Sequence, residues 1–330
     1  MKFSLRGAGI LGLRWPDTPL VLCLLQSPVA LTIQVSGGTI PSLRVTQMGW
    51  VQIEGRAYWL VFVGAFLVVA IWETYRPQRQ LLVSAGRRWR NHGIVWFSCA
   101  ASLTLLARVS PVLIAVSVGD SHDGLLNGNQ PPWVIRWLLA VVLLDFARYL
   151  IHLGLHKIPG MWRFHEVHHS DPDFDLSTGL RVHPIEVLYN QACYLGAVAV
   201  LAPPISAVVV AELTSVFMSI FGHANASLPP LLERISRYIF VSPDMHRVHH
   251  SEEISEQNAN FGDILPWWDR VFGTYTANPA AGQAGLILGI RGQQEPKSLS
   301  VSFMLRQPFR PRSVDENDRL TAKGEADRSV

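Results

Sequence analysis

The stretch of residues 133–156 reads WVIRWLLAVVLLDFARYLIHLGLH, an apolar run that ends in histidines. Its apolar part, Trp133–Ile151, carries three charged residues: Arg136, Asp145 and Arg148. A helix needs about 20 mostly apolar residues to cross a bilayer, so this segment has nearly the required length. We therefore expect a membrane-spanning helix here, with polar side chains concentrated toward its second end.

His152 and His156 are four residues apart, so they share one face of this helix near its end. Tyr149 and Asp145 continue the same stripe. Asp145 could accept a hydrogen bond from a metal-bound histidine, which is a common arrangement around metal sites. The pair alone is equally consistent with a polar stripe that faces neighbouring helices.

The composition is typical of a membrane protein. Among 330 residues, 49% are hydrophobic and 16% are charged, against about 25% charged residues in soluble domains. Eleven tryptophans suit interfacial aromatic belts. A net charge of +3 without a basic stripe argues against nucleic-acid binding. No Cys-x-x-Cys pair occurs, so the three cysteines are expected in the core: Cys23, Cys99 and Cys193.

Three further apolar segments are candidates for crossing the membrane: Ala57–Trp72, Gly93–Val118 and Val187–Leu232. The second is interrupted by Arg108 and by Ser110-Pro111. The third is long and contains Pro203-Pro204 near its middle, which predicts a helical hairpin that turns at the prolines. The sequence thus predicts an all-α membrane bundle of about three spans plus a spanning or re-entering hairpin, with a helical cap.

Arginines mark the segment between the first two candidate spans: Arg76, Arg79, Arg87, Arg88 and Arg90. The next loop, Gly119–Pro132, contains no Lys or Arg. By the positive-inside rule the arginine-rich segment is cytoplasmic and the next loop faces the other side. The histidine-rich segments then fall on the cytoplasmic side. Other basic residues on that side agree: Lys157, Arg163, Arg181, Arg234, Arg237 and Arg247.

The chain divides into four parts by composition. Residues 1–50 are an N-terminal extension of uncertain role, in which prolines oppose a long helix. Residues 51–131 are expected to hold the first membrane helices, and residues 132–276 the catalytic domain. Residues 277–330 form a C-terminal cytoplasmic segment, expected to be disordered from about residue 311 because charged residues dominate there.

Ten of the twelve histidines lie within residues 152–250. Two hexamers, HEVHHS and HRVHHS, each place histidines at i, i+3 and i+4 on one face of a short helix. They contribute His165, His168 and His169, and His246, His249 and His250. His223 lies at the end of the hairpin, and His183 just before it is a further candidate. His92 and His122 fall outside the cluster, and His122 is predicted on the opposite side of the membrane.

Nine or ten histidines exceed the three or four ligands of a tetrahedral zinc site. Their number suits two metal ions with four or five nitrogens each. Imidazole binds zinc, copper, iron and nickel, so the ligand type alone does not select the metal.

Four segments taken together resemble the fatty acid hydroxylase/sterol desaturase superfamily of integral membrane enzymes. They are DFARYLIHLGLHKIPGMWRFHEVHHSD, LRVHPIE, FGHAN and SPDMHRVHHSEE…NANFGDILPWWDRVFGTY, within residues 132–276. Order, spacing and the closing Asn-x-Asn-Phe-Gly…Trp-Asp-x-x-Phe-Gly-Thr element all agree. One departure is Leu153, where many relatives have arginine after the first histidine.

The resemblance implies a cytoplasm-facing, non-haem di-iron centre that uses O2 to hydroxylate or desaturate a lipid C–H bond. The ligands implied by the motifs are His152, His156, His165, His168, His169, His223, His246, His249 and His250. Tyr149 and Asn260 are candidates for hydrogen bonds around them. No fused haem electron-donor domain is found, so electrons are expected from a separate ferredoxin- or cytochrome-type donor and its reductase. The short, unfused architecture suggests a bacterial-type member in the inner membrane.

Two other functions are open on sequence grounds. HEVHH matches the His-Glu-x-x-His pattern of zinc hydrolases, with Glu166 as the general base. The sister hexamer has Arg247 at that position, which argues against a catalytic role for Glu166. A metal carrier or sensor would place its ligands near the bilayer midplane, whereas these lie toward the cytoplasmic edge.

Overall fold

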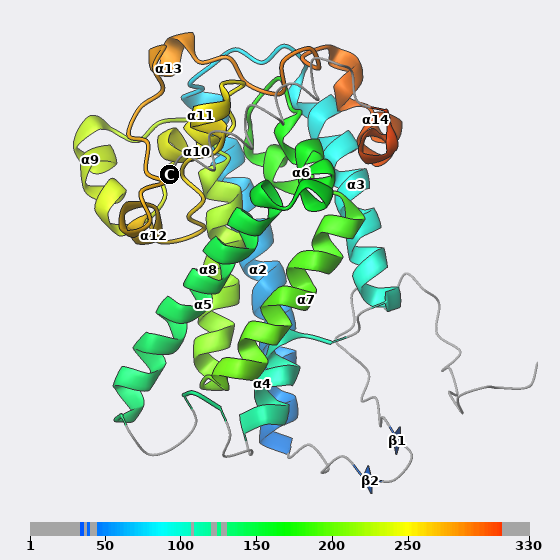
Figure 1. Ribbon diagram of the computed structural model, residues 1–330, viewed down its shortest axis with the longest axis vertical. Coiled ribbons are helices and arrows are strands. Elements are labelled where there is room, and N and C mark those ends of the chain that lie inside the picture. Colours follow the sequence, from blue (N-terminus) through cyan, green and yellow to red (C-terminus); the bar gives the residue numbers. More distant parts are fainter. Residues whose placement is uncertain are drawn as a thin grey trace, which may run out of the picture. The chain divides into compact units, whose positions relative to one another are not determined.

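Helices form almost all the regular structure in the computed structural model of the protein (Figure 1). The structure describes residues 34–35, 38–39, 45–106, 109–119, 124–126 and 131–311. Strands β1 (Gln34–Val35) and β2 (Gly38–Thr39) pair antiparallel. The chain divides into two compact units, residues 1–56 and 57–330. All histidines named above belong to the second unit. The predicted all-α class is confirmed.

The longer helices are α2 (Val45–Tyr75), α3 (Ala85–Leu106), α5 (Trp133–Lys157), α7 (Pro184–Leu201) and α8 (Ile205–Gly222), with the shorter α4 (Pro111–Gly119). The remaining helices are α6 (Pro159–His169), α9 (Pro230–Ile239), α10 (Pro243–His249), α11 (Ile254–Gln257), α12 (Trp267–Val271), α13 (Gly282–Gly285) and α14 (Val301–Arg306). Three 3₁₀ turns are η1 (Leu176–Leu180), η2 (Pro296–Leu299) and η3 (Gln307–Phe309). Proline begins α6, α7, α9 and α10, where its missing N–H costs no hydrogen bond.

Three helical segments are long and apolar enough to cross a membrane: Gly49–Tyr75, Trp133–Lys157 and Ile205–Gly222. Large apolar side chains on these helices are exposed, for example Leu60 and Val68 on α2 and Leu138 on α5. Contiguous exposed apolar surface is uncommon on soluble proteins and suits contact with lipid tails. The spans predicted from Ala57 and from Trp133 are both present.

The predicted hairpin turns at the two prolines, as expected. Helix α7 ends at Leu201, Ala202 adopts a left-handed conformation with φ of 43°, and α8 begins at Ile205. The prediction was too long at its far end, because helix α8 stops at Gly222 and α9 is a separate helix. Proline at position 230 explains that restart, since it favours the first turn of a new helix.

The apolar segment predicted over Gly93–Val118 is two helices, α3 and α4, and neither is among the three membrane-crossing candidates. Pro111 begins α4, since proline cannot continue a helix from the preceding turn. Cys99 is buried and Cys193 half-buried, and both are free thiols, whereas Cys23 lies outside the described residues.

Helices α5, α7 and α8 run side by side and carry α6 and α10 at a shared end (Figure 1). The arginine-rich segment joins the same end. Arg88 is fully buried and binds Asp171 and Asp175 just after α6, with Nη1–Oδ1 and Nε–Oδ2 distances of 2.7 and 2.9 Å. Burial alone would raise the pKa of Asp171, but Arg88 holds that pKa below its usual value. A buried charge is tolerated only when paired in this way.

Candidate metal centre

Nine histidines from α5, α6, α10 and the end of α8 converge at this shared end. They form two groups, and within each group one possible ligand atom per residue lies within 4.8 Å of all the others. The five-histidine group consists of His152, His156, His165, His169 and His249. The four-histidine group consists of His168, His223, His246 and His250. These are the nine histidines that the sequence motifs nominate.

The two hexamers each contribute to both groups, in a reciprocal way. In α6 the middle histidine, His168, joins the four-histidine group while the outer two join the five-histidine group. In the α10 hexamer the middle histidine, His249, joins the five-histidine group while the outer two join the four-histidine group. A helix turns by about 100° per residue, so the side chain of residue i+3 points about 60° to one side of residue i and that of residue i+4 about 40° to the other side. One short helix can therefore direct histidines into two different groups.

Hydrogen bonds fix the ring orientation of two ligands in the five-histidine group. Nδ1 of His152 donates to the Phe261 carbonyl at 2.9 Å, and Nδ1 of His249 donates to the Ala259 carbonyl at 2.7 Å. A carbonyl only accepts, so each Nε2 keeps a free lone pair, and these two Nε2 atoms are 3.0 Å apart. Two lone pairs repel at that distance unless a cation lies against both.

The spacing fits a metal ion. Imidazole nitrogens bind zinc at about 2.0–2.1 Å, and two such nitrogens at a right angle are about 3 Å apart. His223 repeats the pattern in the four-histidine group, because its Nδ1 donates to the Ser219 carbonyl at 2.6 Å. Its Nε2 lies 3.0 Å from Nε2 of His246 and 3.2 Å from Nε2 of His168.

The surroundings are dry, which favours neutral imidazole. Burial, and then the neighbouring histidines, lower the pKa of five of these side chains well below the usual histidine value: His168, His169, His246, His249 and His250. Both ring nitrogens of His250 are buried without a hydrogen-bond partner within the described residues. Such groups are costly unless something binds them, and a metal ion would do so. The residues therefore fit two metal ions.

The loop around Asn260 supports the five-histidine group. Asn260 has φ of 56°, a conformation that asparagine tolerates better than most residues. Its side chain donates to the Met245 carbonyl at 3.0 Å and the Thr276 carbonyl at 2.8 Å. Asp269 accepts the N–H of Phe261 at 2.8 Å. The Asn-x-Asn-Phe-Gly and Trp-Asp elements thus hold the two carbonyls that orient His152 and His249.

Glu186 is a functional candidate that the sequence reasoning missed. Its Oε1 accepts from Nδ1 of His165 at 2.7 Å, and both side chains are buried. Carboxylates in this position orient a ligand histidine and raise its basicity. A signal was available, because an acid in the first turn of an otherwise apolar hairpin arm needs a partner.

The structure gives the stripe residues of α5 other roles than those expected. The Asp145 carboxylate accepts from the Ile264 and Leu265 backbone at 3.0 and 3.3 Å and from Trp268 Nε1 at 2.8 Å, not from a ligand histidine. Asp145 lies about two turns before His152, too far along the helix to reach it. The Tyr149 hydroxyl lies 3.1 Å from Thr274 Oγ1.

The remaining histidines lie outside both groups. His183 caps the N-terminus of α7, where its Nδ1 accepts from the Ile185 N–H at 3.2 Å. Nδ1 of His92 lies 2.8 Å from the Ser177 hydroxyl, beside the buried Arg88 cluster. His122 is not among the described residues.

The residues that differ between the hexamers also differ in role. Glu166 Oε1 accepts from Gln293 Nε2 at 2.9 Å, and Glu166 belongs to neither histidine group. Arg247 is buried and donates to Asp244 and to the Ala224 carbonyl. A general base in a zinc hydrolase would have to face the metal, so the contacts of Glu166 give that alternative no support.

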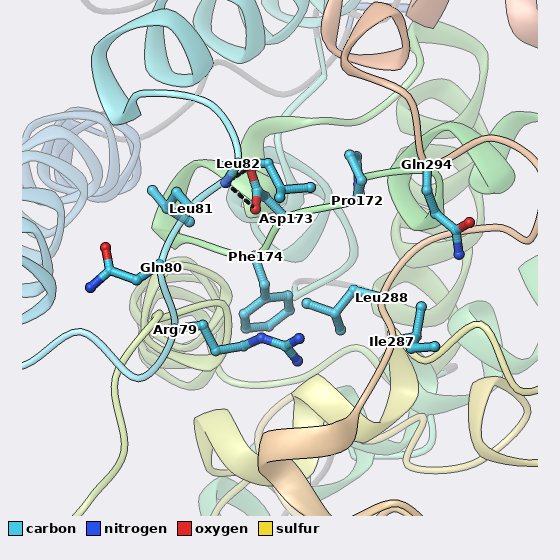
Figure 2. A pocket seen from close by; sticks show the side chains of 10 residues that line it. All are labelled: Arg79, Gln80, Leu81, Leu82, Pro172, Asp173, Phe174, Ile287, Leu288 and Gln294. Carbon is cyan, nitrogen blue, oxygen red and sulfur yellow. Dashed lines mark hydrogen bonds between the residues drawn. The ribbon is translucent and has the colours of Figure 1, made fainter.

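A pocket of about 290 Å³ is lined by residues of the segments 79–82, 172–174 and 287–294 (Figure 2). Figure 2 shows Arg79, Phe174 and Leu288 among the side chains that line it. The Phe174 ring lies between this pocket and the ligands, with centroid distances of 5.1 Å to His250 and 5.5 Å to His223. One aromatic side chain thus separates the pocket from the group.

Comparison with known proteins agrees with this geometry. Residues 137–274 match the family model described as fatty acid hydroxylase. The matched segment contains all nine histidines of the two groups. The resemblance seen in the sequence motifs is thereby confirmed, and the family match supports an oxidoreductase.

Related members of the family differ in how much of their length is matched. Ornithine lipid hydroxylase OlsE of Rhizobium tropici is 26% identical over 266 residues, 76% of this chain and 75% of that protein. Alkylglycerol monooxygenase of Homo sapiens is 31% identical over 148 residues, 44% of this chain and 31% of that protein. A cholesterol 25-hydroxylase-like protein of Danio rerio is 29% identical over 160 residues, 44% of this chain and 59% of that protein. No solved structure matches the chain.

Proposed function

We propose that the protein is a membrane-bound, non-haem di-iron oxygenase that hydroxylates a C–H bond of a lipid. The observation that carries the proposal is the division of nine histidines, eight of them buried, into groups of five and four within the segment that matches the fatty acid hydroxylase family model. Iron bound there would supply the activation of O2. The reaction balances as R–H, O2, two electrons and two protons giving R–OH and water.

The chain's own residues have three tasks in this reaction. The hydrogen bonds of His152, His249 and Glu186 hold the imidazole rings in the orientation that binding requires. The dry surroundings keep the imidazoles neutral and exclude water from the reacting atoms. Asn260 keeps the supporting carbonyls in place. The protein thus contributes orientation and a closed site, while the cofactor carries the chemistry.

A lipid substrate is supported by the relatives and by the apolar helices. The relatives are named as hydroxylases or a monooxygenase of ornithine lipids and alkylglycerols. Those names favour hydroxylation over desaturation for this chain as well. The lipid would reach the histidine groups from the bilayer, because three helices are suited to cross it.

We further propose that the histidine groups face the cytoplasm, in a bacterial inner membrane. The arginine-rich segment at 76–90 packs onto the same end as the histidines, through Arg88 and through Arg79, whose backbone N–H donates to Asn225 Oδ1. Positive residues favour the cytoplasmic side. A separate ferredoxin- or cytochrome-type donor would then supply electrons from that side, where the pocket lined by Phe174 lies.

Metal analysis and isotope labelling test the proposal. Full-length protein in lipid nanodiscs, loaded anaerobically with Fe(II), is expected to hold two irons per chain. With reduced ferredoxin and ¹⁸O2, extracted lipids should gain one ¹⁸O atom per turnover. One zinc per chain, or two irons with no ¹⁸O in any lipid of the host, would refute it. Comparing lipids of cells with and without the gene would identify the substrate.

A further inference from the structure

Helices α9 and α12, outside the membrane-crossing helices, present a group of exposed apolar side chains. We define the α9–α12 face by its exposed large apolar residues: Leu231, Leu232, Ile235, Tyr238, Ile239, Trp267, Val271 and Phe272. Leu231 is 67% exposed and Val271 is 70% exposed. A water-facing cap helix would not present so many apolar side chains together.

A surface helix of a soluble protein buries its apolar face and exposes its polar face. Helix α9 does the reverse. Its polar side chains Glu233 and Ser236 are buried, while its apolar ones point outward. Glu233 accepts from Arg237 Nε and from the Ser242 hydroxyl, both at 2.6 Å. Ser242 caps the N-terminus of α10, the helix that carries His246 and His249. Specific polar contacts therefore fix α9 with its apolar face outward.

Helix α12 extends the same face toward α5, and Figure 1 shows the two short helices next to each other. Trp267 Nε1 donates to the Tyr238 carbonyl at 2.8 Å, which joins α12 to the end of α9. The Phe272 ring stacks on Tyr149 and Phe146 of α5, at centroid distances of 5.6 and 5.7 Å. The face thus adjoins helix α5 at Tyr149, which is buried, and at Phe146, which is half-buried.

The composition of the rim indicates which surface covers this face. Arg234 is exposed on α9, and Arg270 lies against the Tyr238 and Tyr275 rings at 5.4 and 3.9 Å. Tryptophan, tyrosine and arginine at the border of an apolar face are typical of helices that lie in the interface of an anionic bilayer.

We propose that the α9–α12 face is immersed in the membrane interface and delivers the lipid substrate to the five-histidine group. Delivery rests on the function proposed above, whereas immersion does not. A row of neighbouring rings leads inward from the face. Phe272 is followed by Tyr149, then by Phe261 at a centroid distance of 6.4 Å from Tyr149, and then by His152 at a centroid distance of 5.7 Å from Phe261. Displacement of Phe272 would open this route from the bilayer.

The proposal has a consequence for the position of attack. Interfacial helices lie about 5–10 Å into the boundary between headgroups and acyl chains. His152 and His156 occupy the last turns of α5, so they lie at the same boundary. We therefore expect oxidation near the polar end of the lipid rather than near the end of its chain. Tandem mass spectrometry of the ¹⁸O-labelled product gives the position.

Spin labels test the immersion directly in full-length protein in nanodiscs that contain anionic lipid. Labels at Leu231→Cys and Val271→Cys should relax more strongly with O2 than with a water-soluble nickel chelate. A label at Ser255→Cys, an exposed position of α11, should show the opposite and serves as the matched control. Unmutated protein carried through the same labelling gives the contribution of its own cysteines. Equal nickel access at all three positions, or protection from both reagents at 231 and 271, would overturn the proposal.

Charged variants test delivery. Leu231→Glu and Val271→Glu should each raise the KM for the lipid roughly tenfold, because a carboxylate disfavours the interface. Iron content should not change, and Ser255→Glu should match the wild type. An unchanged KM in both variants would refute delivery. If labels report immersion and no lipid is oxidised by the wild type, the proposed function fails while the immersion stands.

Discussion

The two histidine groups share both hexamers but differ in how their ligands are supported. In the five-histidine group, three ligands donate from Nδ1 to fixed acceptors: Phe261, Ala259 and Glu186. In the four-histidine group only His223 has such a bond, to Ser219. Within the described part of the chain, Nδ1 of His168 and both nitrogens of His250 have no hydrogen-bond partner, and in the five-histidine group the same holds for Nδ1 of His169. The five-histidine group is therefore better organised before any metal binds, and we expect it to bind iron more tightly.

The largest effect is expected from removing one ligand of each group. His249→Ala should reduce the iron of the five-histidine group and His168→Ala that of the four-histidine group, and both should lower turnover by at least about 100-fold. Because the four-histidine group is left with three ligands, His168→Ala should lose nearly one full iron per chain. Iron analysis of the purified variants measures this. Full iron retention in both would refute the ligand assignment.

A smaller effect is expected from the carboxylate that orients His165. Glu186→Gln should weaken iron binding to the five-histidine group by about 10- to 100-fold, since the charged acceptor is lost. Glu166→Gln makes the same chemical change beside His165 and should leave iron binding unchanged. Competition with a chelator measures both affinities. If Glu166→Gln abolished activity and Glu186→Gln did not, the hydrolase reading of HEVHH would regain its support.

A still smaller effect is expected in the loop that supplies the Ala259 and Phe261 carbonyls. Asn260→Gly keeps the positive φ and removes three side-chain hydrogen bonds, whereas Asn260→Ala also strains the backbone. We expect losses of about 1–3 kcal/mol in unfolding free energy, larger for alanine. Iron should be lost preferentially from the five-histidine group. A loss confined to the four-histidine group would contradict the role given to this loop.

The smallest effect is expected at His183. His183→Asn preserves a capping side chain at the start of α7, and His183→Ala removes it at a cost of about 1 kcal/mol. Neither variant should change the iron content, because His183 belongs to neither group. Thermal unfolding and iron analysis, run together, check this. Loss of one iron in both variants would make His183 a ligand after all.

The structure brings together the nine histidines that the sequence nominated, but their division into two groups could not be predicted. Spacings of three or four residues place eight of the nine histidines on helix faces with one another, whereas His223 was nominated by its position at the end of the hairpin and by the resemblance. The reciprocal division of the two hexamers depends on how α6 and α10 are rotated relative to each other. That rotation is set by tertiary contacts, such as those of Arg88 and Arg247, and has no local signature.

Supporting contacts were harder to predict for a different reason. The carbonyls of Ala259 and Phe261 act through the backbone, which any residue could supply, so their types carry no signal. Asp145 was expected beside a ligand but holds the loop at Ile264 instead, because a carboxylate accepts from any nearby N–H. The hairpin turn at Pro203-Pro204 was predictable, since proline excludes a continuous helix.

The most direct test of two unequal iron sites is Mössbauer spectroscopy of full-length protein loaded with ⁵⁷Fe(II). We expect two quadrupole doublets of equal area in the wild type. In His168→Ala one doublet should disappear while the other, from the five-histidine group, remains. A single doublet from one iron per chain, or the loss of both doublets together in His168→Ala, would contradict the division into two groups.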